Sequence, residues 1–591
     1  MSIESCLNKV PPVLITALPI SKYQMVSRCE KIVNIGLFFD GTGNNRAADM
    51  SSNAHSNVAR LFDAYKDDPG QGFFRYYIEG IGTKCDLVND PGKTTAGLAF
   101  GSGGKARVLL GLLQVLNSLH SFVNRREETK GVPVGVPMFQ LTQIQALCSD
   151  APHGSYKLND NDTPYDQLRK AARLDSGLLA CNMVELKHFF SVCGQRIHDQ
   201  LAKISTRPTV VSIYLDVIGF SRGAAEARVF VNWLNAFMMS RGDADARQLF
   251  GVPSYVRFLG LFDTVASVIG GPVGLLMGSG HDDWASMKNL AIPPRPVVQH
   301  CVHYVALHEL RNSFPIDSIY VDGVAPDNCY ERVGPGSHSD IGGGYVPGAQ
   351  GKGVDSSRQP LQAQDRHKLS QFYLNEMLAQ ARQSAALCGP ESYPWLDERD
   401  KEAVQRKIQR QFAFDPRVRQ AIERYFALCG IAACSTLEMA LREHGLRYLA
   451  WRYQLLKERS FKDLPSVVHA AHTDPKGVKY YRMSQDLFAK QVMCVEVRVG
   501  SYYREAPAML KRMKRMTTTL ELGMFFDWWV HDSYAVFLQA FEGETLTFSM
   551  AEPHGYIRYR VLFLGTDERG REVRRNAVLW PADSAPMMRS A

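Results

Sequence analysis

Short apolar runs that end in clusters of glycine, asparagine and aspartate recur in the first half of the chain. The runs rich in β-branched and aromatic residues, which predict buried strands, are residues 31–39, 73–78, 209–218, 256–261 and 300–306. Helical segments are predicted at residues 108–123, 175–204 and 222–239. Strands that alternate with helices in this way predict an α/β fold built on a doubly wound, mostly parallel sheet.

The pattern changes along the chain and predicts four regions. A loose leader precedes the α/β core, and the core carries helical insertions, with a polar and irregular one at about residues 125–180. A mainly helical, charged region follows, and a smaller C-terminal α+β region, rich in β-like runs, ends the chain. These regions are residues 1–30, 31–360, 361–490 and 491–591.

The composition is that of an ordinary folded protein. Of the 591 residues, 45% are hydrophobic and 22% are charged, which excludes the disordered and fibrous classes. The net charge of +8 is small for this length, so we expect no nucleic-acid binding. Twelve cysteines are scattered without a C-x-x-C pair. We therefore expect no zinc site, no disulfide framework and no metal or other cofactor.

The apolar stretch near the N-terminus does not have the form of a targeting signal. Three prolines interrupt residues 11–20, and no small-residue cleavage site follows them. We therefore expect no signal peptide, and no transmembrane helix anywhere in the chain. A protein of this kind that acts outside its cell must leave by a route that uses no cleaved signal.

The strongest candidate for chemistry is Ser221, in the G-x-S-x-G sequence Gly219-Phe-Ser-Arg-Gly223. The motif directly follows a continuous β-branched run and directly precedes a predicted helix. This strand–turn–helix setting is that of the nucleophile elbow in α/β hydrolases. The flanking glycines remove the Cβ atoms that would clash in so sharp a turn. We therefore predict a serine hydrolase in which the Ser221 hydroxyl attacks an ester carbonyl.

A serine nucleophile needs a base and a carboxylate that orients the base, and in this fold the acid and then the histidine follow the serine. Asp263 lies at the end of an apolar predicted strand, where loops build the site. His338 lies in a glycine-dense loop that allows close approach of the backbone. His531 is its competitor as the base. His303 and His308 lie in or beside a predicted strand, which favours structural roles.

Two backbone amides must stabilise the oxyanion that forms on the attacked carbonyl. The amide of Arg222, directly after the nucleophile, is the first candidate. We expect the second from Asp40 or Gly41, in the turn that ends the first predicted strand. The glycine-rich apolar segment 270–278 predicts either a flap that touches an apolar substrate or the start of a buried helix. The substrate contacts we expect there are Gly274, Leu275 and Leu276.

Motifs of other enzyme classes are incomplete. The sequences around Lys93 and Lys105 imitate a phosphate-binding loop, but Leu87 and Ala99 replace the glycines that it requires. Residues 308–312 lack the second histidine of the zinc-protease motif H-E-x-x-H. A nucleotide hydrolase and a zinc protease are therefore excluded.

Five motifs occur along the chain in a fixed order: Phe38-Phe-Asp-Gly-Thr-Gly-Asn-Asn45, Gly80-Ile-Gly-Thr83, Gly219-Phe-Ser-Arg-Gly-Ala224, Phe262-Asp-Thr-Val265 and His338-Ser-Asp-Ile-Gly-Gly-Gly-Tyr345. The series resembles the bacterial and fungal α/β hydrolases that carry an F-D-G-T-G-N signature. Within that group the chain is most similar to the first family of type VI secretion lipase effectors. The stretches 530–533 and 552–559 also resemble those effectors.

The resemblance implies a phospholipase A-type hydrolase of membrane glycerophospholipids, with Ser221, Asp263 and His338 as its catalytic triad. It implies an antibacterial effector that is made in the bacterial cytoplasm and delivered to the periplasm of target cells. The implied partners are the phospholipid membrane, a type VI secretion spike protein and a cognate immunity protein. Two alternatives stay open: an intracellular carboxylesterase or thioesterase, and a catalytically silent secretion adaptor that keeps the fold.

Overall fold

The computed structural model describes most of the chain from residue 30 onward. The described residues are 30–92, 103–127, 133–152, 161–202, 209–242, 246–266, 281, 283–321, 324–355, 362–397, 400, 402–429, 436–500, 502–540, 555–567, 569, 571–575 and 579–580. The predicted leader, apart from Glu30, and the predicted substrate contacts Gly274, Leu275 and Leu276 lie outside the described residues.

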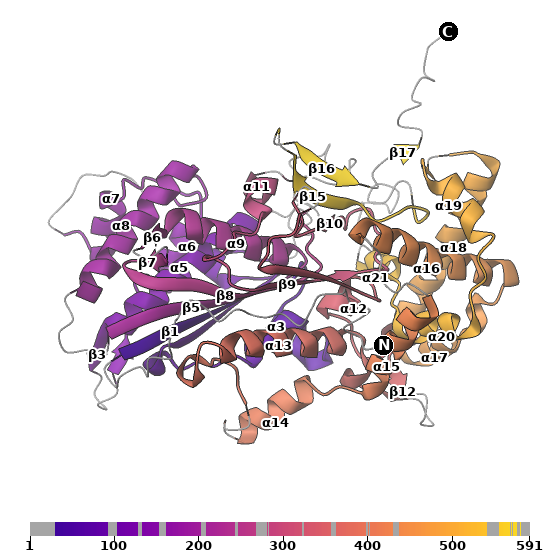
Figure 1. The fold of residues 1–591 in the computed structure, drawn as a ribbon, viewed down its shortest axis with the longest axis horizontal. Helices are drawn as coiled ribbons and strands as arrows, with labels where there is room; N and C mark the ends of the chain where they lie inside the picture. The colour runs from indigo at the N-terminus through magenta and orange to yellow at the C-terminus, as the bar shows by residue number, and fades with distance from the viewer. Residues whose placement is uncertain are drawn as a thin grey trace, which may run out of the picture.

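A parallel sheet of six strands forms the centre of the molecule (Figure 1). In spatial order the strands are β11 (Cys329–Gly334), β9 (Cys301–Ala306), β8 (Val252–Phe262), β5 (Thr209–Phe220), β1 (Glu30–Phe39) and β2 (Phe73–Ile78). The strands pair in parallel throughout this series. An antiparallel hairpin of β6 (Met239–Arg241) and β7 (Arg247–Leu249) adds to the amino end of β8. The predicted α/β class and mostly parallel sheet are confirmed.

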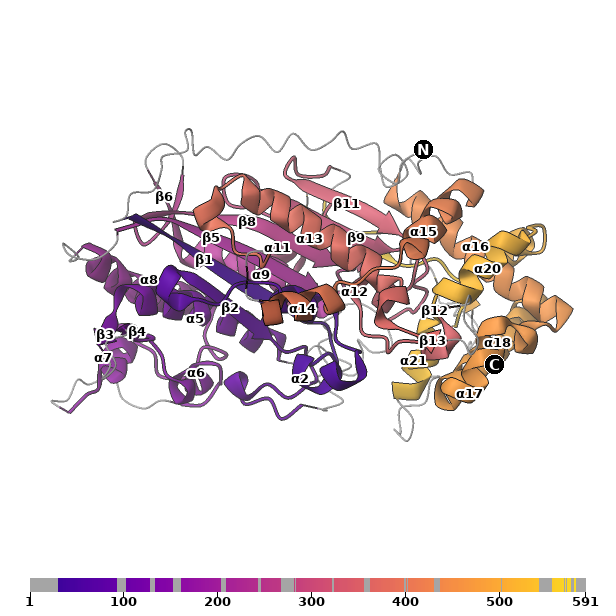
Figure 2. The same ribbon diagram turned by 90° about the horizontal axis from the view of Figure 1, so that it is seen from below.

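Helices cover both faces of the sheet (Figure 2). On one side lie α5 (Gly104–Val123), α8 (Met183–Ala202) and α9 (Arg222–Phe237), and on the other α3 (Asn57–Asp63) and α13 (Ser370–Ala386). Successive residues of a strand point to opposite faces. In β1, Leu37 and Phe39 therefore join the apolar cluster of the α5 and α9 layer, whereas Phe38 joins the cluster of the α3 and α13 layer. Burial on both faces explains the nearly continuous apolar runs of the central strands.

The helix α5 is long and apolar enough, by length and composition, to cross a membrane. In this structure 89% of its apolar window is buried inside the molecule. Its leucine and valine side chains belong to the same apolar cluster as α9 and the central strands. We therefore interpret the composition of α5 as that of a core helix.

The predicted insertion after α5 contains short elements of its own. They are β3 (Arg125–Glu127), β4 (Pro133–Gly135), α6 (Leu141–Leu147) and α7 (Pro164–Ala171). The ring of Phe139 stacks on Phe189 of α8, with centroids 6.2 Å apart, so this insertion packs on the outer side of the helical layer.

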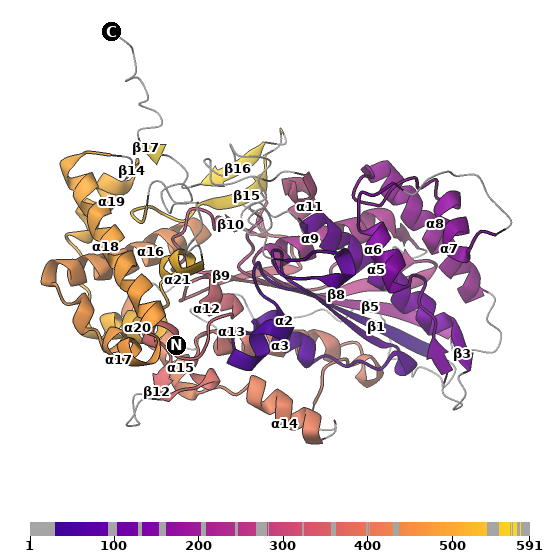
Figure 3. The same cartoon turned by 180° about the vertical axis from the view of Figure 1, so that it is seen from behind.

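The described chain beyond α13 is largely helical, and it lies beside the carboxyl ends of the strands (Figure 3). Its helices are α14 (Glu402–Gln411), α15 (Pro416–Cys429), α16 (Leu437–Glu458), α17 (Pro465–Thr473), α18 (Pro475–Val497), α19 (Ala506–Met513), α20 (Leu520–Trp529) and α21 (Ser533–Ala540). The strands β14 (Tyr502–Tyr503) and β17 (Leu579–Trp580) pair with each other. The strands β15 (Leu562–Thr566) and β16 (Glu572–Arg575) join β10 (Ile316–Asp317) in a small mixed sheet.

The prediction that residues 491–591 are β-rich is wrong for the described part of this region. Three helices, α19, α20 and α21, lie between β14 and the strands β15 to β17, and α18 runs across the predicted boundary at residue 490. These three helices have only eight to ten residues and pack against longer helices. Short buried helices and strands give similar apolar runs, so periodicity alone does not separate them. The other predicted boundaries stay predictions.

The strand order brings the loops after β1 and β5 together. The chain runs from β1 to β2 on one side and later places β5 on the other side of β1. Ligands of open α/β sheets bind at the carboxyl ends of strands where the order reverses in this way. Phe39 pairs with Gly219, and Phe220 pairs with Phe262. The turns that contain the predicted site residues therefore leave the sheet side by side.

The turn between β5 and α9 depends on close approach of two backbone segments. A Cβ atom on Gly219 would lie 2.4 Å from the carbonyl oxygen of Gly223. A Cβ atom on Gly223 would lie 2.3 Å from the carbonyl oxygen of Phe39. Because these oxygens belong to the backbone, no side-chain rotation relieves either contact. The two glycines therefore allow the start of α9 to pack against the end of β1.

We expect Gly223→Ala to disrupt this packing and to lower the free energy of unfolding by about 1–3 kcal/mol. This is the usual cost of adding a methyl group to a closely packed core. Gly445→Ala in α16 is the matched control, because its Cβ atom would meet Leu310 at an ordinary 3.5 Å. Alanine in a helix is more favourable than glycine by about 0.5–1 kcal/mol. Thermal unfolding followed by circular dichroism measures both variants. Equal unfolding midpoints would contradict the tight packing of the turn.

Candidate active site

Ser221 occupies the sharp turn between β5 and α9. Its backbone has φ 57° and ψ −125°, a conformation that is strained for a residue with a side chain. The Ser221 amide donates a hydrogen bond to the carbonyl of Phe262 at 2.9 Å, and its carbonyl accepts one from the amide of Val265 at 3.3 Å. Ser221 is only 4% exposed. The turn is thus tied to the segment that follows β8, where Asp263 lies.

Asp263 and His338 form a buried pair beside this turn. The Nδ1 atom of His338 lies 2.6 Å from Oδ2 of Asp263. Asp263 directly follows β8, and its Oδ1 also accepts a hydrogen bond from the Ala306 amide at 2.8 Å. His338 is the first residue of the short helix α12 (His338–Gly342), whose N-terminus Ser337 caps. Two residues that the sequence singled out, 75 positions apart, therefore meet as an acid–histidine pair.

The surroundings of the pair keep the imidazole neutral and the carboxyl ionised. Burial lowers the pKa of His338 below its usual value, although the hydrogen bond that its Nδ1 donates to Asp263 acts in the opposite direction. Burial raises the pKa of Asp263, but the guanidinium of Arg560 and the hydrogen bond with His338 outweigh it and leave this pKa well below its usual range. A neutral histidine that is oriented by a carboxylate is the form required of a general base.

His338 lies against the residue that precedes Ser221. The ring of Phe220 is 4.7 Å from the His338 ring, between centroids, and the ring of Phe314 packs on it at 4.8 Å. Among the described contacts none is a hydrogen bond between the Ser221 hydroxyl and His338. Catalytic hydrogen bonds without substrate are often longer than those in the working complex. The structure therefore brings the serine turn and the acid–histidine pair to one site.

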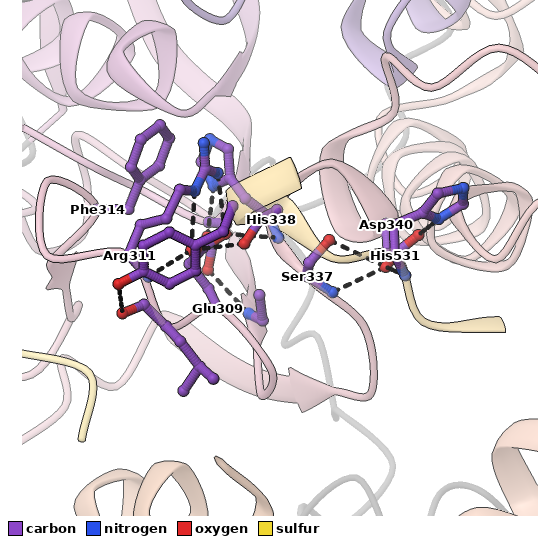
Figure 4. Close-up of polar contacts among 12 residues, drawn as sticks. Glu309, Arg311, Phe314, Ser337, His338, Asp340 and His531 are labelled. Atoms are coloured by element: carbon purple, nitrogen blue, oxygen red, sulfur yellow. Dashed lines mark hydrogen bonds and ion pairs between the residues drawn. The ribbon is translucent and has the colours of Figure 1, made fainter. Parts of the chain in front are cut away.

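The competitor His531 forms a different pair. Its Nδ1 atom lies 2.6 Å from Oδ1 of Asp340, and its ring stacks on Tyr345 with centroids 3.9 Å apart. Asp340 also accepts hydrogen bonds from the amides of His531 and Ser337, at 3.0 and 2.9 Å. Figure 4 shows His338 and His531 well apart, with Ser337 between them. His531 therefore holds the loop that carries His338, whereas Asp263 orients His338 itself.

The other two histidines considered lie in buried networks. His303 accepts a hydrogen bond at Nε2 from the Thr264 amide, at 3.0 Å, and its Nδ1 contacts Glu331 at 2.8 Å. His308 accepts one at Nδ1 from the Gly336 amide at 3.0 Å. His303 therefore fixes the backbone directly after Asp263, and His308 fixes the backbone two residues before His338.

The loop after β1 packs directly on the serine turn. A Cβ atom on Gly41 would lie 2.6 Å from the ring of Phe220. The Asp40 amide donates to the Ile78 carbonyl at 3.0 Å, and the Gly41 amide donates to the Asp40 carboxylate at 2.7 Å. The expectation that these two amides bind an oxyanion therefore does not fit, because both are already engaged. The amide of Thr42 makes no hydrogen bond among the described residues, while Arg222 begins α9 as expected.

The side chain of Asp40 explains the shape of this loop. Its carboxylate accepts hydrogen bonds from the hydroxyls of Ser56, at 2.7 Å, and Tyr77, at 2.5 Å, besides the Gly41 amide. Burial raises the pKa of Asp40 to about 6, against the lowering effect of these hydrogen bonds. These hydrogen bonds connect the loop after β1 to β2, through Tyr77, and to the N-terminus of α3, through Ser56.

Sequence reasoning missed the charged residues that surround the pair. Arg560 donates to both carboxylate oxygens of Asp263, at 2.8 and 2.7 Å. Glu309 accepts hydrogen bonds from Arg311, at 2.9 Å, from the Ser533 hydroxyl, at 3.0 Å, and from the His338 amide, at 3.3 Å (Figure 4). Burial raises the pKa of Glu309, but the Arg311 guanidinium outweighs it and brings this pKa to about 2.

A weak signal for these residues exists in the sequence. Residues 556–561, Tyr-Ile-Arg-Tyr-Arg-Val, interleave arginine with apolar side chains in a pattern that is unusual for a surface. Arginine is rarely buried unless it is paired. The pattern suggests buried partners but cannot name them.

Among the described residues, no group of three or more His, Cys, Asp or Glu side chains could hold a metal ion.

Comparisons with known proteins give matches among solved structures and one match to a family model. Among solved structures, the chain is similar to an uncharacterized protein from Pseudomonas aeruginosa, with a TM-score of 0.68 and 23% identity over 93% of this chain and 81% of that one. This likeness supports the fold. A Tle1 effector bound to the VgrG spike of the type VI secretion system matches with a TM-score of 0.33 and 16% identity, over 70% of this chain and 84% of that one.

A search of curated proteins finds no match. A family model described as the catalytic domain of Tle1-like phospholipase effectors of type VI secretion matches residues 235–380. This segment contains Asp263 and His338, and it begins within α9, after Ser221. The resemblance inferred from the motifs is therefore confirmed over residues 235–380, which are similar to the catalytic domain of Tle1-like phospholipase effectors of type VI secretion.

Proposed function

We propose that this protein is a serine-dependent phospholipase A-type hydrolase of membrane glycerophospholipids. The observation that carries the proposal is the buried hydrogen bond between Asp263 and His338 beside the strained turn at Ser221. The family match supports hydrolase chemistry, because the matched segment contains both members of the pair. The phospholipid substrate and the role of each residue are parts of the proposal.

The proposed reaction assigns one role to each of these groups. His338, neutral and oriented by Asp263, accepts the hydroxyl proton of Ser221 as the serine oxygen attacks the acyl carbonyl of the lipid. The amide of Arg222 at the N-terminus of α9 and the amide of Thr42 stabilise the oxyanion of the tetrahedral intermediate. His338 then gives its proton to the departing lysophospholipid oxygen. Water, deprotonated by the same histidine, releases the fatty acid from the acyl-enzyme.

The proposed setting is attack on rival bacteria. The family match to type VI secretion effectors supports delivery into target cells. We propose that a spike protein carries the chain to the periplasm, where the phospholipid membrane is the substrate. A cognate immunity protein in the producing cell is the partner that such a toxin requires.

Labelling with a fluorophosphonate probe tests the nucleophile. The native protein is expected to be labelled at Ser221, because a strained, base-assisted serine attacks the phosphorus of the probe. Ser221→Ala is expected to abolish the labelling and to lower ester turnover by about 10⁴-fold or more. The structural control is an unchanged unfolding midpoint of Ser221→Ala. Absence of label on the folded native protein would favour the silent adaptor.

A comparison of substrates tests the lipid specificity. Purified protein is expected to release fatty acid from phosphatidylethanolamine vesicles and to be inactive on them after Ser221→Ala. Short water-soluble esters serve as the second substrate, and fatty-acid release is measured with both at equal acyl concentration. Fast turnover of the soluble esters with none on vesicles would instead identify an esterase of soluble substrates.

Separate replacement of the two histidines tests the base. His338→Ala is expected to lower kcat by about 10⁴-fold or more, as removal of a catalytic base does in serine hydrolases. His531→Ala removes a hydrogen bond to Asp340, so it is expected to lower the unfolding free energy by about 1–3 kcal/mol and to lower turnover far less than His338→Ala does. Turnover and thermal unfolding are measured for both. Loss of turnover only in His531→Ala would overturn the assignment.

A further inference from the structure

Arg560 reaches the site from a segment almost 300 residues after Asp263. The residue lies just before β15, and it is 1% exposed. Its two terminal nitrogens donate to the two carboxylate oxygens of Asp263, at 2.8 and 2.7 Å. Its Nε donates to the Phe314 carbonyl at 2.9 Å, and Nη1 also reaches the Ala306 carbonyl at 3.1 Å. The guanidinium is thus also held by two backbone carbonyls of the segment that runs from the end of β9 to β10.

This contact has the geometry of a strong, oriented ion pair. A planar guanidinium that donates in parallel to both oxygens of a carboxylate fixes the plane of that carboxylate as well as its charge. The same Oδ2 atom of Asp263 accepts from His338, and Oδ1 accepts from the Ala306 amide. The carboxylate therefore cannot rotate without breaking several hydrogen bonds at once.

The second acid–histidine pair shows that such an arginine is not needed to build a pair of this kind. Asp340 contacts His531 at the same distance of 2.6 Å, and both are buried. The hydrogen bonds that Asp340 accepts come from backbone amides, the Ser337 hydroxyl and the His531 ring. A buried ion pair is often no more stabilising than apolar side chains of equal volume. The arginine at Asp263 therefore calls for an explanation beyond stability.

We propose that Arg560 is a positioning residue of the catalytic pair, which fixes the Asp263 carboxylate toward His338 and reduces the basicity of the imidazole. The proposal rests on the proposed serine hydrolase function. A lone carboxylate beside a histidine favours the protonated imidazolium. A carboxylate whose charge is balanced by a guanidinium favours it less. The histidine then remains a free base at a lower pH than it would beside Asp263 alone.

The other charged groups around His338 balance each other. Glu309 accepts from the His338 amide, and Arg311 pairs with Glu309 at 2.9 Å. Two residues further along α12, Asp340 is paired with His531. Removal of Arg560 would therefore leave Asp263 as the uncompensated charge next to the imidazole. The pKa of His338 would rise, and so would the pH below which the enzyme is inactive.

The test is the pH dependence of kcat/KM for a soluble ester, from pH 4 to 9, in the full-length protein. In the native enzyme the acidic limb is expected below pH 6.5, because burial lowers the pKa of His338. In Arg560→Met the limb is expected to move upward by about one pH unit, the size of effect that a neighbouring charge has. The plateau is expected to fall by about 10²-fold or more, since misorientation of the base is costly.

Two further variants separate positioning from stability. Arg560→Lys keeps the charge but loses the parallel pair of hydrogen bonds. Its acidic limb is expected to stay at the native pH while its plateau falls. Arg558→Met removes another buried arginine of the same segment, which donates to the Leu310 carbonyl at 2.9 Å, and its limb is expected to stay at the native pH.

The outcomes distinguish this proposal from the function on which it rests. A native enzyme without turnover or probe labelling overturns the proposed function and this inference together. An active native enzyme with an unmoved limb in folded Arg560→Met overturns only the role of Arg560. If Arg560→Met does not fold, a native plateau in Arg560→Lys overturns the positioning role instead. A limb that shifts equally in Arg558→Met identifies a merely structural effect and also overturns it.

Discussion

The carboxylate of Asp263 makes hydrogen bonds to residues of the central sheet, of α12 and of the C-terminal region. It leaves the central sheet at the end of β8, accepts from the amide that ends β9, orients the histidine of α12 and accepts the guanidinium of Arg560. A buried carboxylate without such partners would cost several kcal/mol or take up a proton. Its ionised state, which the chemistry requires, therefore depends on segments from the core and from the C-terminal region at once.

The serine turn obeys a different constraint, one of space. Gly219 and Gly223 leave no room for side chains because α9, the end of β1 and the end of β5 approach each other through their backbones. Although the contact with β1 is distant in sequence, the glycines that permit it lie within a few consecutive residues. The nucleophile elbow, the strand before it and the helix after it could therefore be predicted from the sequence. The same is true of Asp263, because an apolar run followed by an aspartate marks the end of a strand.

The choice of histidine could not be settled in that way. His338 and His531 both lie near an aspartate along the chain, and each is buried, so local pattern does not separate them. The decision rests on pairings between residues 75 and 191 positions apart. The same holds for the loop after β1. The Asp40 carboxylate accepts a hydrogen bond from the Gly41 amide, so we propose the Thr42 amide as the oxyanion donor instead. Side-chain hydrogen bonds to the backbone decide such details, and composition does not reveal them.

The two acid–histidine pairs are linked through one short helix, and this link changes how the C-terminal region is understood. α12 begins at His338, and Asp340 lies within its five residues. Asp263, which belongs to the core, contacts the first residue of this helix, His338. His531, which belongs to the C-terminal region, contacts the third residue, Asp340, and Ser533 donates a hydrogen bond to Glu309. A displacement of residues 531–533 would therefore also displace α12, and His338 with it, even with the core intact. The described C-terminal residues therefore help to build the candidate site. A core cut at residue 360 would keep Ser221, Asp263 and His338 but would lose the contacts that Arg560, His531 and Ser533 make around them.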